Sequence, residues 1–201
     1  MMRWLLCLAM AGVALLGHAG ELSADIAARL ADAPVIRGQF EQKKTLVGFR
    51  QPLVSRGDFL LWRDHGVVWH TLTPFDSRLV LSRRRMTSTQ GGATYQMDAQ
   101  KEPGLLIANE VMFAVLAGNV GALSQRFQIS GSLMGADAWQ LKLVPRDAGL
   151  AKVFRAIELS GARYVQEVKL EDGSGDVTAI RFSQLKSATE VAPDEVKNFA
   201  D

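Results

Sequence analysis

Most of the chain, from Val35 to Ser187, consists of short segments in which apolar and polar residues alternate, separated by turn residues. Such segments, rich in Val, Ile, Thr, Phe and Trp, are typical of β-strands with one apolar face. Short turns such as Gln90-Gly91-Gly92 indicate antiparallel neighbours. We predict about eleven strands, at residues 35–45, 55–63, 67–71, 78–82, 85–89, 93–97, 127–132, 139–144, 155–160, 165–171 and 176–187.

Few segments have a helical pattern. Leu22, Ile26 and Leu30 recur at four-residue intervals, and Pro34 closes this first segment. Residues 105–117 are apolar with almost no charge, so a helix there must cover another part of the molecule. Residues 147–153 are predicted to form one or two further turns. Since no linker or internal repeat is apparent, we expect one domain, a large antiparallel sheet with a few helices.

The N-terminus has the pattern of a secretory signal peptide. Arg3 is followed by an apolar run, residues 4–16, and then by small residues up to Ala19. The run is shorter than the roughly 20 residues that a membrane-spanning helix needs. We expect residues 1–19 to be cleaved, which would remove Cys7 and leave residues 20–201 as a single exported domain. An uncleaved anchor is the alternative.

Composition and motifs exclude several classes of function. A net charge of +2 is too small for a dedicated nucleic-acid-binding protein. One cysteine and three histidines exclude a disulfide framework, an iron-sulfur cluster and a zinc site built from several cysteines. We therefore predict no metal, no cofactor and no nucleic-acid partner.

No catalytic motif is apparent, and we predict that the protein is not an enzyme. In residues 131–135 the serine lies one place too early for a G-x-S-x-G motif, and we interpret the stretch as a hairpin turn. A hydrolase that uses Asp64 with His65 or His70 is kept as a minor hypothesis. The run 83–85 of three arginines is either a docking patch for an acidic partner or a charge cluster that keeps a strand edge soluble.

Four residues between Gly57 and Pro74 carry a family resemblance. Gly57 and the following aspartate begin a strand that leads to Arg63, Trp69 follows six residues later, and Pro74 lies beyond it. This order resembles the strand-turn-strand motif of the LolA-type outer-membrane lipoprotein carriers. The resemblance extends over roughly residues 22–190 and includes segments 40–43, 78–82, 111–119, 139–145 and 180–186.

The resemblance implies a mainly β (α+β) fold. In this family about eleven strands form a half-open, strongly curved antiparallel β-barrel around an apolar cavity, capped by an N-terminal helix and a lid helix. The strand count above is compatible with that fold, and methionines suit a cavity that accepts flexible chains. We expect the acyl-cavity lining to include Phe59, Leu61, Val67, Trp69, Leu79 and Leu81, with Met97, Met112, Phe113 and Leu116 on the lid side.

The resemblance also implies a function. At about 0.8 kcal/mol per methylene, an acyl chain of about fifteen carbons costs roughly 12 kcal/mol to hydrate, so it needs an escort across water. The family's carriers bind the acyl chains of lipoproteins and take them from an inner-membrane donor complex to an outer-membrane acceptor. We expect a monomeric periplasmic carrier of lipoproteins or of another acylated lipid. The alternative is a non-enzymatic envelope assembly factor that binds a protein partner on its concave sheet.

One residue has a specific role in the family. The arginine at the position of Arg63 hydrogen-bonds backbone carbonyls of the lid helix in the empty state, so Arg63 is expected to be the lid latch. The alternative is a strand-end arginine that stacks on Trp62 or Trp69. This chain has Asp64 where the founding carriers commonly have proline, and it ends soon after Pro193, where they continue with a tail that packs on the barrel. In the founding carriers this tail affects exchange with the inner-membrane donor complex and the outer-membrane acceptor, so its absence leaves both partners of this chain open.

Overall fold

Eleven strands form one antiparallel sheet in a computed structural model that describes residues 18–82, 85–98, 111, 113–114 and 119–199. Their order is β6-β5-β4-β3-β2-β1-β11-β10-β9-β8-β7, so β6 and β7 are the two edges and the sheet is not closed. The strands are β1 (Val35–Thr45), β2 (Leu53–Trp62), β3 (Gly66–Thr73), β4 (Ser77–Ser82), β5 (Arg85–Gln90), β6 (Ala93–Asp98), β7 (Phe127–Met134), β8 (Ala138–Pro145), β9 (Phe154–Gly161), β10 (Val165–Asp172) and β11 (Val177–Ala188).

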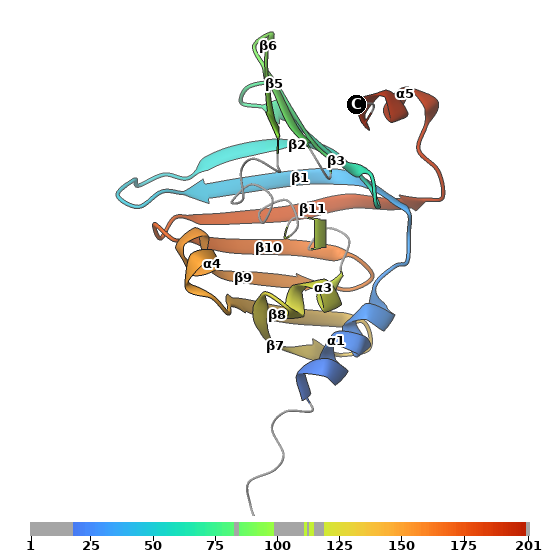
Figure 1. The fold of residues 1–201 in the computed structure, drawn as a ribbon, viewed down its shortest axis with the longest axis vertical. Helices are drawn as coiled ribbons and strands as arrows, with labels where there is room; N and C mark the ends of the chain where they lie inside the picture. Colours follow the sequence, from blue (N-terminus) through green and yellow to red (C-terminus); the bar gives the residue numbers. More distant parts are fainter. Residues whose placement is uncertain (1–17, 83–84, 99–110, 112, 115–118, 200–201) are drawn as a thin grey trace, which may run out of the picture.

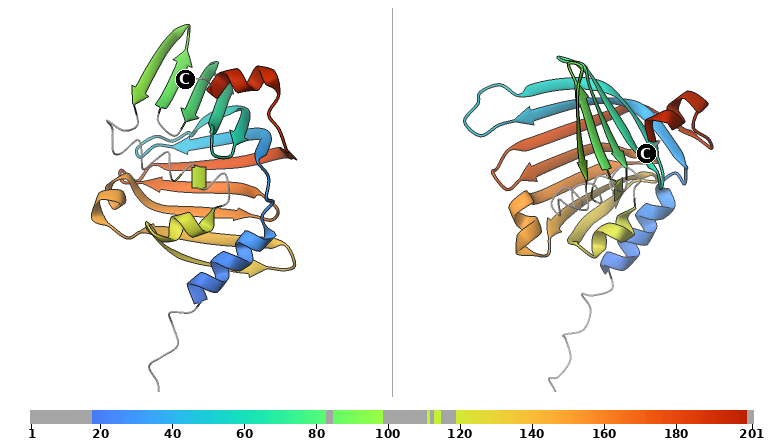
Figure 2. Two further views of the ribbon diagram at one scale, coloured as in Figure 1. Left: turned by 45° about the vertical axis from the view of Figure 1, so that its right-hand side comes forward. Right: turned by 45° about the horizontal axis from the view of Figure 1, so that its top comes forward.

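The sheet is strongly curved (Figures 1 and 2). Strands β7 to β11 lie side by side with β1 and β2, whereas β5 and β6, drawn in green, run at a steep angle to them. This arrangement confirms the predicted mainly β, half-open architecture. The edge strands β6 and β7 are not paired with each other, so no ladder of backbone hydrogen bonds closes the sheet into a barrel.

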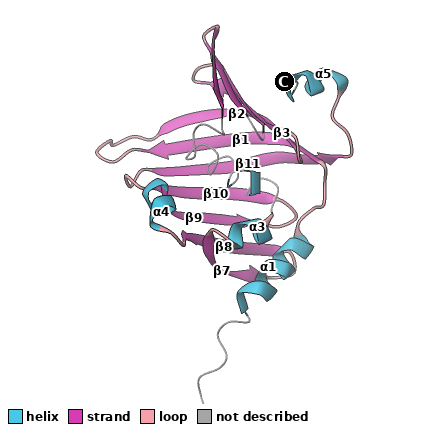
Figure 3. Cartoon of the chain, in the orientation of Figure 1, coloured by secondary structure: helices cyan, strands magenta, loops and turns pink. Residues whose placement is uncertain are grey.

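The helices, cyan in Figure 3, are short (Figure 3). They are α1 (His18–Arg29), α3 (Val120–Ser124), α4 (Ala148–Val153), α5 (Pro193–Val196) and the 3-10 turn η1 (Lys197–Phe199). Helix α3 begins at Asn119, whose side chain accepts a hydrogen bond from the Ala122 amide at 3.2 Å. Helix α4 begins at Asp147, which accepts one from the Leu150 amide at 2.8 Å. Such caps satisfy amide groups that the first turn leaves unpaired.

The main hydrophobic core lies on the inner face of the sheet. In β8 the alternate residues Trp139, Leu141 and Leu143 are at most 3% exposed, and their neighbours on β9 continue the same apolar layer. Helices α1, α3 and α4 cover this part of the sheet with Ile26, Val120, Leu123 and Leu150. The N-terminal helix therefore caps the β7 end of the inner face, and a capping N-terminal helix is what the family resemblance implies.

Every predicted strand is present, but two sequence interpretations need comment. The interpretation of residues 131–135 as a hairpin turn is wrong, because β7 continues to Met134 and the turn begins at Gly135. Gly131 is required within the strand, because a Cβ there would lie 2.1 Å from the Gln140 carbonyl oxygen. In the expected helix 105–117, Val111, Phe113 and Ala114 are helical, and the other residues lie outside the described part of the chain.

The C-terminal segment packs on the outer face, where a second cluster is formed by Val35, Leu60 and Val68. The Phe199 ring lies 5.4 Å from the Trp62 ring, edge to face. Arg37 binds both carboxylate oxygens of Glu195, with Nε donating to Oε1 at 2.9 Å. Residues near the end of this chain therefore do pack on the barrel, although the sequence pattern contains no sign of this contact.

The Arg37–Glu195 ion pair makes C-terminal docking sensitive to acid. The hydrogen bond from Arg37 lowers the pKa of Glu195 below its ordinary value. A carboxyl group with a lowered pKa in the folded state stabilises that state fully above its unfolded pKa, and the contribution is lost as the pH falls through the folded pKa. At pH 7 we expect Glu195→Gln to lower the free energy of unfolding by about 1 kcal/mol.

Urea denaturation at pH 7 and below about pH 4 measures this effect, with Glu190→Gln, an exposed carboxylate on the same segment, as the control. The difference between Glu195→Gln and the wild type should shrink in acid, while the control follows the wild type at both pH values. A difference of equal size at both pH values would contradict the role given to the ion pair.

Candidate functional site

Four aromatic rings form a continuous wall on the inner face of β1, β2, β3 and β11. Phe40 stacks on Trp69 with ring centroids 3.9 Å apart. Phe182 lies edge to face with Phe59 at 5.1 Å and with Trp69 at 6.1 Å. The register explains this cluster, because Phe40 is paired with Phe182 and Phe59 with Trp69 across neighbouring strands.

Gly57 makes this arrangement possible. It lies opposite Phe40 in the β1–β2 ladder, next to an irregularity in the β2–β3 register. A Cβ at Gly57 would lie 1.8 Å from the His70 carbonyl oxygen and 3.0 Å from Cε1 of Phe40. Only glycine therefore allows β2 and β3 to approach this closely while the Phe40 ring lies over the position and stacks on Trp69.

The structure brings six of the predicted lining residues together in the inner-face cluster. They alternate along three adjacent strands and are Phe59, Leu61, Val67, Trp69, Leu79 and Leu81. Phe113 packs against the same cluster, whereas Met97 is 39% exposed on the edge strand β6. Met112 and Leu116 lie outside the described residues. The role of these residues as an acyl-binding surface stays a prediction.

Two members of the aromatic wall are not among the predicted lining residues. Phe40 and Phe182 are only 2% and 6% exposed, and both face the tryptophan. The alternation within β11, where Ile180 and Phe182 share a face, is the signal available in the sequence. It does not reveal that β11 pairs with β1, because these strands are far apart along the chain.

Arg63 lies at the end of β2, away from the aromatic wall along the strand. Its amide donates to the Pro34 carbonyl oxygen at 2.8 Å, and Nη1 of its guanidinium binds Oδ1 of Asp32. Asp32 belongs to the connection between α1 and β1, so this ion pair holds the N-terminal helix connection to the β2–β3 hairpin. The lid segment that Arg63 would hold falls largely outside the described residues, and the latch stays a prediction.

The β2–β3 turn explains one departure from the family motif. Asp64 has a φ angle of +67°, and proline, whose φ is fixed near −65°, cannot adopt that conformation. The alternative role for Arg63 is to stack on Trp62 or Trp69. The Trp62 ring stacks on the His65 ring, with centroids 3.5 Å apart. At the far end of β3, Pro74 follows the strand directly.

The two histidines of the hydrolase hypothesis, His65 and His70, have structural partners. The Nδ1 of His70 lies 3.4 Å from Asp58 and its Nε2 lies 3.0 Å from Asp76, while Nδ1 of His65 faces the Arg63 carbonyl oxygen at 3.0 Å. Within the described part of the chain, neither ring is hydrogen-bonded to a serine, threonine or cysteine. The described residues also contain no group of three or more potential metal ligands from His, Cys, Asp and Glu.

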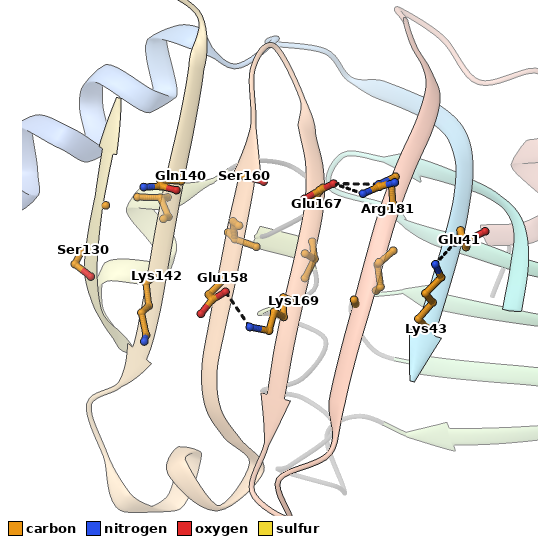
Figure 4. A pocket seen from close by; sticks show the side chains of 16 residues that line it. Glu41, Lys43, Ser130, Gln140, Lys142, Glu158, Ser160, Glu167, Lys169 and Arg181 are labelled. Carbon is orange, nitrogen blue, oxygen red and sulfur yellow. Dashed lines mark hydrogen bonds and ion pairs between the residues drawn. The ribbon is translucent and has the colours of Figure 1, made fainter. Parts of the chain in front are cut away.

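A hollow of about 480 Å³ lies on the outer face, across strands β7 to β11 and β1. Figure 4 shows that charged side chains from neighbouring strands meet there in pairs. Lys169 lies 3.4 Å from Glu158, and Arg181 lies 2.9 Å from Glu167. This lining suits a solvated sheet surface rather than an acyl chain, whose methylene groups gain nothing from paired charges.

The family model of the outer membrane lipoprotein carrier protein LolA matches residues 32–197. This chain belongs to the LolA family. The match begins at Asp32, the partner of Arg63, and ends at Lys197 in the docked C-terminal segment, so it includes the whole sheet.

Individual relatives are distant in sequence. An outer-membrane lipoprotein carrier protein from Alkalilimnicola ehrlichii is 25% identical over 191 residues, which cover 94% of this chain and 84% of the relative. A LolA superfamily protein from Nitrosomonas europaea has a TM-score of 0.49 and 10% identity, with 91% of this chain and 97% of that chain covered. A DUF1329 family protein from Desulfovibrio piger has a TM-score of 0.49 and 7% identity, with 86% and 92% covered.

In the structure the four motif residues all lie on or beside the β2–β3 hairpin. Gly57 and Trp69 build the aromatic wall, Arg63 ties the hairpin to the chain before β1, and Pro74 ends β3. No helix within the described ranges is long and apolar enough to cross a membrane.

Proposed function

We propose that this protein carries the acyl chains of lipoproteins, or of another acylated lipid, on the inner face of its sheet. The observation that carries the proposal is the wall formed by Phe40, Phe59, Trp69 and Phe182 inside a sheet with two unpaired edges. LolA-family membership supports it, as does the name of the Alkalilimnicola relative. The carrier would take its cargo through the periplasm from an inner-membrane donor toward an outer-membrane acceptor.

The open sheet suits reversible loading. Helices α1 and α3 rest on the inner face through side-chain packing, with Ile26 and Leu123 buried against the strands. Moving a covering element would expose the apolar face without breaking the hydrogen-bond ladder of the sheet. An apolar face can replace the lipid environment at about 0.8 kcal/mol per methylene, and partial burial of the chain keeps release possible.

Export fits the same proposal. Residues 1–19 would be the signal peptide, and cleavage after Ala19 would leave the part of α1 that packs on the core, including Ile26. N-terminal sequencing of the periplasmic protein, with Gly20 as its first residue, tests this assignment.

Titration with a fluorescent fatty acid tests acyl binding. We expect saturable binding with a blue-shifted, enhanced emission, and displacement by an acylated lipopeptide but not by the same peptide without its acyl chains. Absence of saturable binding to folded protein would contradict the proposal and favour an assembly factor with a closed, packed interior.

Arg63 is proposed to favour the closed, empty state through the lid. Its removal should then shift the protein toward the open, loaded state. We expect Arg63→Leu to raise the affinity for the acyl probe about fivefold, equivalent to about 1 kcal/mol, and to slow its release in stopped-flow measurements.

Asp32→Asn is the matched control because it removes the partner of Arg63 in this structure. If Arg63 acts through the lid, Asp32→Asn should leave probe affinity within about twofold of the wild type. Equal effects of the two substitutions would assign Arg63 to the α1–β1 connection instead, and no effect of Arg63→Leu would exclude the latch.

A further inference from the structure

The hairpin that joins β1 and β2 carries three large, exposed apolar side chains within seven residues. Val47, Phe49 and Leu53 are 65%, 69% and 61% exposed. Large apolar side chains exposed together are uncommon on a soluble protein surface and mark interaction sites. We call these three residues the hairpin tip.

The hairpin tip is an ordered structure. The Phe49 amide donates to the Leu46 carbonyl oxygen at 3.1 Å, and Gly48 has a φ of +85°, which turns the chain. The Val47 amide donates to Oδ1 of Asp176 at 2.9 Å, so the β10–β11 turn supports the tip from the side. The apolar side chains are therefore held outward by a defined backbone.

Three cations lie on the hairpin, and two of them are close to carboxylates of other segments or of β1. Residues 42–55 contain Lys43, Lys44 and Arg50 and no carboxylate. Lys43 pairs with Glu41 at 3.1 Å and Lys44 approaches Asp176 at 3.8 Å, whereas Arg50 is exposed at the turn itself. Apolar side chains with adjacent cations are the combination that binds the interface of an anionic bilayer.

The shape of the molecule gives the tip access to a flat surface. The hairpin projects beyond the neighbouring strands on the left of Figure 1. The β3–β4 turn lies toward the same end of the sheet, since Thr73 pairs with Arg56 on β2. This turn exposes two further apolar side chains, Leu72 at 51% and Phe75 at 70%.

We propose that the hairpin tip is a peripheral membrane-contact site that inserts Val47, Phe49 and Leu53 into the surface of an anionic phospholipid bilayer. The exposed Arg50 attracts the lipid headgroups, the two lysines add to this where they exchange their carboxylate partners for phosphates, and the apolar side chains enter the boundary between headgroups and acyl chains. The site does not depend on acyl binding at the aromatic wall, because the two surfaces share no residue.

Vesicle flotation tests the proposal with the full chain and the double variant Val47→Asp/Phe49→Asp. On vesicles of phosphatidylethanolamine and phosphatidylglycerol, we expect the double variant to lose at least about tenfold in partitioning. The apolar run of residues 4–16 could itself bind vesicles, but it is identical in both proteins. A difference in flotation between them is therefore caused by the hairpin tip. Arg50→Glu should weaken binding to these vesicles but have little effect on vesicles of neutral phosphatidylcholine.

Met134→Asp is the matched control, because Met134 is 42% exposed at the β7–β8 turn, at the opposite end of the strands. It should float like the wild type. Far-UV circular dichroism of the same samples should be unchanged in all variants, which shows that they are folded whether or not the protein binds acyl chains. Equal flotation of wild type and double variant would overturn the proposal, as would a double variant that changes only the oligomeric state in sedimentation.

Discussion

Alanine at position 57 is expected to lower the free energy of unfolding by about 3 kcal/mol. The new methyl group would lie 1.8 Å from the His70 carbonyl oxygen, a backbone atom that cannot move without separating β2 from β3. The displacement would also push the Phe40 ring away from Trp69, which it now stacks upon at 3.9 Å. Urea denaturation followed by tryptophan fluorescence measures both the loss of stability and the altered tryptophan environment.

Gly121→Ala is the control for this substitution. Gly121 lies in helix α3, and the atom nearest to a Cβ added at this position would be Asn119 Oδ1, at 3.7 Å. Alanine there should be neutral or should stabilise the protein by about 0.5 kcal/mol, because it restricts the unfolded chain. A Gly57→Ala protein as stable as the wild type would show that β2 and β3 are not held together as closely as the structure indicates.

An aspartate at position 180 is expected to weaken acyl-probe binding about a hundredfold at pH 7, equivalent to about 3 kcal/mol. Ile180 lies on the inner face of β11, two residues before Phe182, and packs against the apolar cluster while remaining partly exposed. A carboxylate there keeps its hydration water and cannot share the surface with an acyl chain. Partial exposure lets the variant fold, and far-UV circular dichroism checks this.

The adjacent residue supplies the control. Ala179 lies on the same strand but is exposed on the outer face, where it borders the polar hollow. Ala179→Asp introduces the same charge and should bind the probe like the wild type. If both variants bind the probe as well as the wild type, acyl chains are not bound on the inner face. If both lose binding, the added charge disturbs strand β11 as a whole, and the loss does not identify the inner face as the binding surface.

The strands are predictable because each carries its own signal. In β8 the alternation of Trp139, Leu141 and Leu143 with polar residues defines both the strand and its buried face. At Gly131 the local sequence pattern gives the wrong prediction. A glycine between strands usually marks a turn, but here it is needed because β7 and β8 approach closely at Gln140, which depends on the partner strand.

The site is less predictable because its contacts join distant parts of the chain. The lining residues on β2, β3 and β4 follow from alternation near the family motif. Phe182 reaches Trp69 only through the pairing of β11 with β1, and Arg63 meets Asp32 across the β1–β2 hairpin. Phe199 on Trp62 is a contact of the same kind. Contacts between residues so far apart in the chain form only when the whole sheet is folded, and no local sequence pattern predicts them.

Mass spectrometry of the material that co-purifies with the protein from its native periplasm, without detergent, tests acyl carriage most directly. Acyl binding on the inner face predicts an acylated lipid or lipoprotein that can be extracted into organic solvent from the wild type and from Ala179→Asp, and that is lost from Ile180→Asp. Folded wild-type protein that is free of lipid and takes up no fatty-acid probe, with a protein partner in its place, would contradict the proposed function.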